Sequence, residues 1–261
     1  EEFTKINKTI PESAIVSVGV EELYNTALCL LELGIKNILL EKPGAVDIKS
    51  LKKLKSIAKA KSVNLFIAYN RRCYASVLKL KELIYNDGGL RSFNFEFTEW
   101  AHIIVKLPSS DSIKNNWLIA NSTHVIDLAF FIGGKPIEMS SYHSGSLNWH
   151  PSGAIFTGAG LCQNNILFSY SANWTSAGRW ALEFMTEKNR YILKPMERLT
   201  KIKIGSVNEE EVLNIDYSLD DKYKPGLYLQ VKNFLEKDFD YLCSVEEQIT
   251  SFDFFARIGN Y

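Results

Sequence analysis

The sequence predicts an incomplete doubly wound parallel α/β sheet over residues 1–88, followed by a mostly antiparallel α+β domain over residues 89–261. Two observations predict this arrangement. Before Gly88-Gly89, short apolar runs alternate with helix-length amphipathic segments, as in parallel βαβ units. Beyond that pair, segments alternate apolar and polar residues, which is typical of half-buried antiparallel strands.

The first half is expected to contain three strands and three helices. The strands are the apolar runs at residues 14–18, 37–40 and 64–69. The first helix spans residues 23–33 and stops at Gly34, because glycine readily adopts the left-handed conformation that ends helices. Asp47 caps the second helix, and the third includes residues 77–85.

The second half is expected to be rich in strands, with few helices. Its aromatic and β-branched strand candidates lie at residues 92–98, 138–143, 153–161, 166–174, 180–186 and 190–193. Its helix candidates lie at residues 122–132, 226–242 and 245–258.

Composition excludes several classes of function. Thirty basic and thirty acidic residues cancel, and no Lys/Arg block stands out, so we expect no nucleic-acid partner and no membrane. No apolar run in the sequence is long enough to span a bilayer. Four scattered cysteines without a C-x-x-C pair, and histidines without ligand spacing, predict no metal site and favour a cytoplasmic location.

No Gly-rich phosphate-binding turn occurs in the sequence. A doubly wound dinucleotide domain begins with a strand, a G-x-G-x-x-G turn and a helix. Two βαβ steps of ~30 residues each would supply that start, so roughly 60 residues are expected upstream. We therefore expect the chain as given to retain catalytic residues but to bind dinucleotide poorly.

The sequence Glu41-Lys42-Pro43 follows the second predicted strand. Pro43 cannot continue a strand ladder and forces Lys42 into an extended or turn conformation. Ligands of open α/β sheets bind outside the carboxyl ends of the strands, so Lys42 is predicted to face a ligand. An ammonium group there would polarise a carbonyl or stabilise an alkoxide during hydride transfer. The alternative is an ordinary exposed loop lysine.

Three motifs resemble the Gfo/Idh/MocA family of nicotinamide-dependent oxidoreductases. They are Glu41-Lys42-Pro43, the run Tyr69-Asn70-Arg71-Arg72 after the next strand, and His124-Val-Ile-Asp127 in the second half. The resemblance covers residues 11–261. It implies a Rossmann-like first domain, NAD or NADP as cofactor, and a sugar, polyol or nucleotide sugar as substrate.

The resemblance also implies roles for individual residues. Lys42 would contact both the nicotinamide ribose and the substrate hydroxyl. The other residues expected to contact the cofactor are Gly19, Glu21, Glu41, Pro43 and Asn70. The residues expected to contact the substrate are Tyr69, Arg71, Asn121, Asp127 and Arg179, the last because guanidinium groups bind phosphates and carboxylates.

His124 is the predicted general base. Asn121 or Ser122 is expected to cap its helix, which would place His124 in the first turn. A helix N-terminus disfavours the imidazolium form, so the ring would stay neutral and accept the hydroxyl proton. Asp127, three residues on, would orient the ring or complement the helix dipole. The alternative is a structural histidine.

Two positions depart from the family pattern. The family often places an aspartate four residues before this histidine, and this chain has Ala120 there. The segment after the first strand, residues 19–24, ends in Tyr24 in place of the usual histidine. A non-catalytic sensor that binds dinucleotide, and a redox-neutral NAD-dependent glycosidase, therefore remain as alternatives. An open antiparallel sheet also favours a homo-oligomer, either dimer or tetramer.

Overall fold

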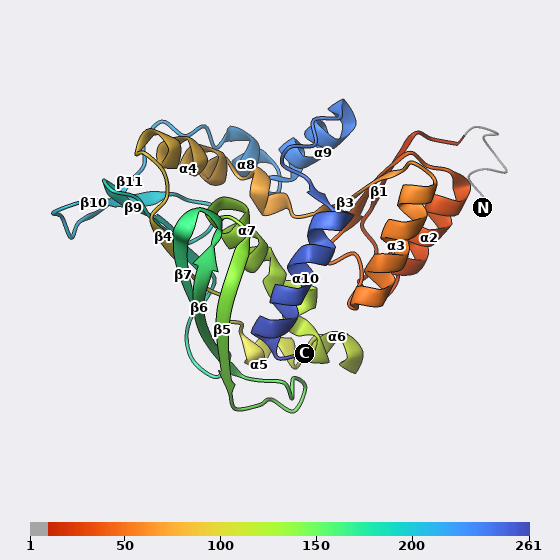
Figure 1. Cartoon of the computed structure of the whole chain (residues 1–261), viewed down its shortest axis with the longest axis horizontal. Coiled ribbons are helices and arrows are strands. Elements are labelled where there is room, and N and C mark those ends of the chain that lie inside the picture. Colours follow the sequence, from red (N-terminus) through yellow and green to blue (C-terminus); the bar gives the residue numbers. More distant parts are fainter. Residues whose placement is uncertain (1–9) are drawn as a thin grey trace. The chain divides into compact units, whose positions relative to one another are not determined.

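The computed structural model describes residues 10–261, which form two compact units (Figure 1). The first contains the described residues up to Tyr69 and the segment Lys232–Asp253. The second contains Asn70–Val231 and Phe254–Tyr261. These units divide the chain differently from the predicted ranges, 1–88 and 89–261: residues 70–88 belong to the second unit, and the segment Lys232–Asp253 belongs to the first.

The sheet of the first unit contains three parallel strands and one short antiparallel strand. β1 (Ser13–Val16), β2 (Asn37–Glu41) and β3 (Asn64–Ala68) are parallel neighbours in that order, which confirms the predicted parallel arrangement. The two-residue strand β12 (Cys243–Ser244) pairs antiparallel with β3, so that Cys243 lies opposite Ile67. No sequence pattern predicted β12.

Helices α2 (Leu23–Leu33) and α3 (Ile48–Ala60) form where the sequence predicted them. Gly34 follows α2 with a φ of 86°, in the left-handed region that glycine adopts without strain. The Asp47 carboxylate accepts a hydrogen bond from the Ser50 N–H at 2.8 Å and caps α3. The two helices lie side by side in Figure 1.

Side chains of both faces of the first sheet are buried, because successive residues of a strand point to opposite faces. Ile38 and Leu40 of β2 pack in one core cluster with apolar residues of α2 and α3. Leu39 belongs to a second cluster, which includes Phe234 and Leu242 from the C-terminal segment. The fold is therefore doubly wound, as predicted. β1 is less buried than β2, because its Ile15 is 48% exposed.

The second unit contains a sheet of eight strands in the order β11-β10-β9-β8-β4-β7-β6-β5. Their bounds are β4 (Ser92–Glu96), β5 (Pro136–Ser144), β6 (Ile155–Cys162), β7 (Ile166–Asn173), β8 (Ala181–Met185), β9 (Asn189–Leu193), β10 (Thr200–Lys203) and β11 (Glu209–Glu211). β4 pairs parallel with β7, and the other neighbouring strands pair antiparallel. The mostly antiparallel domain is thus confirmed, although β10 and β11, which are short and highly charged, were not predicted.

Phenylalanines dominate the inner face of this sheet. Phe93 and Phe95 of β4 alternate with half-buried polar residues, as the pattern predicted. Both rings contact Phe130 of α7 (Thr123–Gly133), at centroid distances of 6.0 and 5.7 Å. On other strands, Tyr142 and Leu167 are largely exposed. The homo-oligomer stays a prediction.

The remaining helices range from single turns to the fifteen residues of α10. They are η1 (Asn70–Cys73), α4 (Ala75–Asn86), α5 (Ala101–Ile104), α6 (Asp111–Asn115), the π-helical turn η2 (Leu118–Ser122), η3 (Gln163–Asn165), α8 (Ser218–Lys222), α9 (Leu227–Glu236) and α10 (Val245–Gly259). The helix predicted at residues 226–242 is shorter than expected, because Lys237 has a positive φ of 61° just after α9. Within residues 10–261, no helix has the length and apolarity needed to cross a membrane.

Candidate functional site

Most residues predicted to contact the cofactor follow the carboxyl ends of β1 and β2. These strands are parallel neighbours, so the loops that follow them leave the same edge of the sheet. Gly19 and Glu21 lie in the exposed loop after β1, and no atom lies within 4 Å of a Cβ built on Gly19. Glu41, Lys42 and Pro43 lie where β2 ends. The loops thus combine exposed backbone with one buried cation.

Lys42 is buried in a tight turn, with 8% of its surface exposed. The Gly44 N–H donates to the Glu41 carbonyl at 3.0 Å and closes the turn, and the Lys42–Pro43 peptide bond is cis. The Gln248 Nε2 atom donates to the Pro43 carbonyl at 3.0 Å. Gln248 lies on α10 and is itself fully buried. The exposed loop lysine that the sequence left as an alternative is therefore ruled out.

Tyr69 and Asn70 are held within the protein. Tyr69 is buried and belongs to the core cluster between the first sheet and α2 and α3. Asn70 belongs to the second unit, where its Nδ2 atom donates to the Pro225 carbonyl at 2.9 Å. That Tyr69 contacts the substrate and that Asn70 contacts the cofactor both remain predictions.

His124 lies in the first turn of α7, as predicted, but the predicted side-chain cap is wrong. The π-helical turn η2 leads directly into α7, and the Thr123 N–H bonds to the Leu118 carbonyl. Ser122 has helical backbone angles and makes no cap hydrogen bond. The first amide of α7 is thus already bonded. Because the π-helical turn runs into α7 without a break, the helix-dipole argument for a neutral His124 loses its basis.

The side chains expected to cap the helix instead bind a buried carboxylate, Glu99. Its Oε1 atom accepts hydrogen bonds from Asn121 Nδ2 at 2.9 Å and from Ser122 Oγ at 2.7 Å. Its Oε2 atom pairs with Arg179 Nη1 at 3.0 Å. Glu99 is 2% exposed, and it follows β4. One carboxylate therefore ties together the end of β4, the turn before His124 and the loop between β7 and β8.

Burial raises the pKa of Glu99 above its usual value, because a charged carboxylate loses its hydration. The hydrogen bonds from Ser122 and Asn121 and the charge of Arg179 act in the opposite direction and stabilise the ionised form. Ala120 carries no carboxyl group, but Glu99 supplies a carboxylate to the turn that leads to His124 through its bonds with Asn121 and Ser122.

Trp180 lies beside the predicted base and against two arginines. Its ring centroid is 6.2 Å from that of His124. The guanidinium carbon of Arg71 lies 4.9 Å from the Trp180 ring, and that of Arg179 lies 4.6 Å from it. These distances are in the range of cation–π contacts. The structure thus brings together three predicted site residues, His124, Arg71 and Arg179, around a tryptophan.

Asp127 has a structural partner. Both of its carboxylate oxygens accept from the Arg72 guanidinium, at 2.9 and 2.5 Å, and both side chains are buried. Such a bidentate pair fixes η1 against α7. The prediction that Asp127 orients His124 or contacts substrate has no support from these contacts. No group of three or more His, Cys, Asp or Glu suited to a metal occurs among the described residues.

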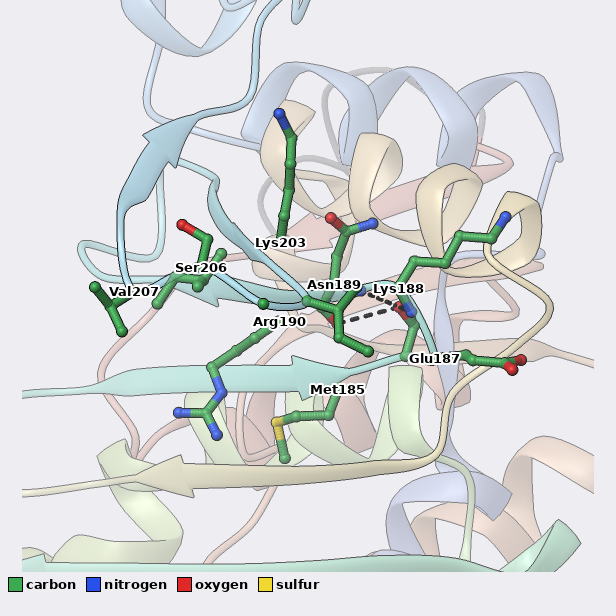
Figure 2. A pocket seen from close by; sticks show the side chains of 12 residues that line it. Met185, Glu187, Lys188, Asn189, Arg190, Lys203, Ser206 and Val207 are labelled. Carbon is green, nitrogen blue, oxygen red and sulfur yellow. Dashed lines mark hydrogen bonds between the residues drawn. The ribbon is translucent and has the colours of Figure 1, made fainter.

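The described surface of the second unit has several hollows. One pocket of about 320 Å³ is lined by Arg71, Arg179, Trp180, Lys194, Pro195, Met196 and Glu197. Another, of about 480 Å³, lies at the turns joining β8 to β9 and following β10. Figure 2 shows that its long side chains, such as Arg190, Lys188 and Lys203, point away from one another. Only the first pocket contains predicted site residues.

Sequence reasoning missed Glu99, Gln248 and Lys194. Glu99 directly follows an aromatic strand, and a polar residue at a strand end is the one available signal. Nothing in the sequence pairs it with Asn121 or Arg179. Gln248 lies 205 positions from Pro43, and only the folded chain brings the two together.

No known family model matches the sequence, and no curated protein matches it. Solved structures do. UDP-N-acetylglucosamine 3-dehydrogenase GnnA from Acidithiobacillus ferrooxidans is 14% identical with a TM-score of 0.70, covering 95% of this chain and 78% of that one. A dehydrogenase (MviM) from Clostridium difficile is 17% identical with a TM-score of 0.73, covering 95% and 78%.

An NAD binding oxidoreductase from Klebsiella pneumoniae is 14% identical with a TM-score of 0.73, covering 99% of this chain and 79% of that one. At these identities the likeness shows the fold. The chain therefore has the two-part fold of these dehydrogenases and oxidoreductases: a parallel α/β sheet and a larger, mostly antiparallel sheet.

Proposed function

We propose that the protein is an NAD- or NADP-dependent oxidoreductase acting on a hydroxyl or ketone group of a sugar, polyol or nucleotide sugar. The observation that carries this proposal is the buried Lys42, in the turn where the parallel strand β2 ends. The similar fold of an NAD binding oxidoreductase supports the cofactor class. The similar fold of a UDP-N-acetylglucosamine 3-dehydrogenase supports a sugar-like substrate.

The described residues fit the nicotinamide end of the cofactor. The loop after β1 is exposed, with open space beside Gly19, and the adjacent turn holds Lys42. Glu41 and Pro43 flank that lysine and are the other residues proposed to contact the cofactor there, with Glu21. A bound nicotinamide would supply the hydride donor or acceptor. The sequence has no Gly-rich turn for its pyrophosphate.

Lys42 and His124 have complementary chemical roles in the proposal. The Lys42 ammonium donates a hydrogen bond to the reacting oxygen and stabilises negative charge on it, and burial strengthens that interaction. His124 accepts the hydroxyl proton when an alcohol is oxidised and returns it when a ketone is reduced. The two residues lie on different units, and each role is argued from its own surroundings.

Replacing Lys42 by methionine tests the proposal. The substitution retains the apolar stem but removes the ammonium group, so turnover is expected to fall by about 100-fold or more. Lys53→Met, at an exposed position of α3, is the matched control and should retain turnover. The measurement is NADH or NADPH absorbance during turnover of the complete gene product, with circular dichroism to check folding. Wild-type turnover by Lys42→Met would remove Lys42 from the mechanism.

Titration of the same proteins with NAD(H) and NADP(H) tests the cofactor class. Binding of neither cofactor by the complete gene product contradicts the oxidoreductase proposal. Binding without turnover would instead indicate a sensor. Turnover without net NADH or NADPH formation would indicate redox-neutral glycosidic cleavage.

A further inference from the structure

The pocket beside Trp180 is rich in cations. Its lining includes three cationic side chains, Arg71, Arg179 and Lys194, and one carboxylate, Glu197. Arg179 also pairs with Glu99, which lies outside the lining, and still leaves the pocket with an excess of positive charge. Positive charge gathered in a concave site attracts anions, because the protein walls reduce the screening by water.

Neighbouring side chains hold both arginines of the pocket. Both guanidinium groups lie against the Trp180 ring, which is 7% exposed. The ion pair with the buried Glu99 further fixes Arg179. The planar guanidinium group matches the paired oxygens of phosphate and carboxylate groups. Lys194 is exposed and adds a point charge.

One residue of the pocket lining lies beside the proposed acid–base residue. Trp180 lines the pocket, and its ring centroid is 6.2 Å from that of His124. The volume of about 320 Å³ is at the lower end of the range for small-molecule sites. It suits a charged substituent of a larger substrate better than a whole nucleotide sugar.

The larger pocket at the β8–β9 turn does not share these properties. Its Arg190 pairs with Glu183 at 3.4 Å, and its Lys203 pairs with Glu210 at 3.2 Å. Its side chains diverge into solvent (Figure 2). Charge and geometry therefore distinguish the two pockets.

We propose that the pocket lined by Arg71, Arg179, Trp180 and Lys194 binds an oxyanion, a phosphate or a carboxylate, carried by the sugar substrate. This inference rests on the proposed function and narrows its substrate class to anionic sugars. Neutral sugars and polyols lack the group that the pocket recognises.

Isothermal titration calorimetry of the complete gene product, with and without saturating NAD(P)H, tests the inference. The probes are UDP-N-acetylglucosamine, glucuronate and neutral N-acetylglucosamine, which separate phosphate, carboxylate and neutral sugars. At least one anionic probe is expected to bind about tenfold or more tightly than the neutral sugar, and less tightly as salt increases. Equal affinity for charged and neutral probes, or no saturable binding of either anionic probe, overturns the proposal.

Lys194→Met and Arg71→Met locate the binding. Each substitution removes one lining cation. Each is expected to weaken binding of the anionic probe by roughly tenfold and to leave binding of the neutral sugar unchanged. Lys188→Met, in the lining of the other pocket, is the matched control and should bind like wild type. An equal loss in Lys188→Met, or wild-type binding by both pocket variants, overturns the assignment. Anion binding without NAD(P) binding would contradict the proposed function alone.

Discussion

At the scale of the residue, Glu99 shows how one buried carboxylate organises several segments. Its three hydrogen-bond donors come from the turn before α7 and from the loop between β7 and β8. Ser122 is fully buried, so its hydroxyl has no access to water as a replacement acceptor. Removing the carboxylate therefore leaves buried polar groups without partners, which costs more than the hydrogen bonds themselves contribute.

We expect Glu99→Ala to lower the free energy of unfolding by about 2–4 kcal/mol, because the donors of Asn121 and Ser122 lose their acceptor. Glu99→Gln retains one acceptor oxygen and should lower the free energy of unfolding by less than Glu99→Ala does. Glu187→Ala is the control: it breaks only an exposed ion pair with Arg91 and should cost about 0.5 kcal/mol or less. Urea denaturation measures all three. Equal losses in Glu99→Ala and Glu187→Ala would contradict the role of Glu99.

The surroundings of some residues could be predicted from the sequence, and those of others could not. The geometry of Lys42 follows from a proline after a parallel strand, and the structure places it in a buried turn. His124 was predicted on the correct helix, but the capping contacts predicted beside it do not form. Caps are short-range contacts, and here the long-range acceptor Glu99 takes the side chains of Asn121 and Ser122 instead.

At the scale of the element, β6 depends on small residues facing aromatic ones. Gly160 lies opposite Met139 of β5 and Phe168 of β7. A Cβ built on Gly160 would lie 2.1 Å from the Glu138 carbonyl oxygen and 2.7 Å from the Phe168 ring. The carbonyl belongs to the neighbouring strand and has little freedom to move.

We expect Gly160→Ala to destabilise the protein by about 1–3 kcal/mol, the usual cost of an added methyl group in a filled space. Ala159→Ser changes the adjacent residue, whose side chain is exposed, and should remain within about 0.5 kcal/mol of wild type. Thermal or urea unfolding gives both values. Wild-type stability in Gly160→Ala would show that β5 and β6 separate more easily than this close contact implies.

At the scale of the whole molecule, distant segments complete both units. β12 and α10 bring the C-terminal segment back to the first sheet, where Gln248 holds the Pro43 carbonyl. In the second unit, His150 joins segments 111 residues apart. Its Nδ1–H donates to the Gly153 carbonyl at 2.8 Å, and its Nε2 accepts from the Tyr261 hydroxyl at 2.6 Å. That hydroxyl in turn accepts the Leu118 N–H.

Because His150 is fully buried, its pKa is lowered from the ordinary value of 6.5, and the neutral ring is the form that fits. Below pH 6.5 the unfolded chain therefore binds a proton that the folded chain does not. Stability is complete above pH 6.5 and falls as the pH decreases from 6.5 through the lower, folded-state pKa.

His150→Gln should lose this pH dependence, whereas His143→Gln, at an exposed position of β5, should keep it. Urea midpoints between pH 7.5 and about pH 5 measure the difference. If the urea midpoint of His150→Gln depended on pH as strongly as that of the wild type, other groups would be responsible for the pH dependence.

The sequence alone determined the elements whose stability is local. Apolar spacing and terminal residues such as Gly34 and Asp47 placed α2 and α3, because helix ends depend on nearby backbone and side-chain contacts. Alternation placed most strands of the second sheet, and the proline at 43 placed Lys42 at a strand end. Tertiary structure decided what those residues contact. The pairing of Glu99 with Asn121 and Arg179, of Arg72 with Asp127, and of β12 with β3 joins residues far apart in the chain. Such contacts depend on the packing of whole elements, which no local pattern records.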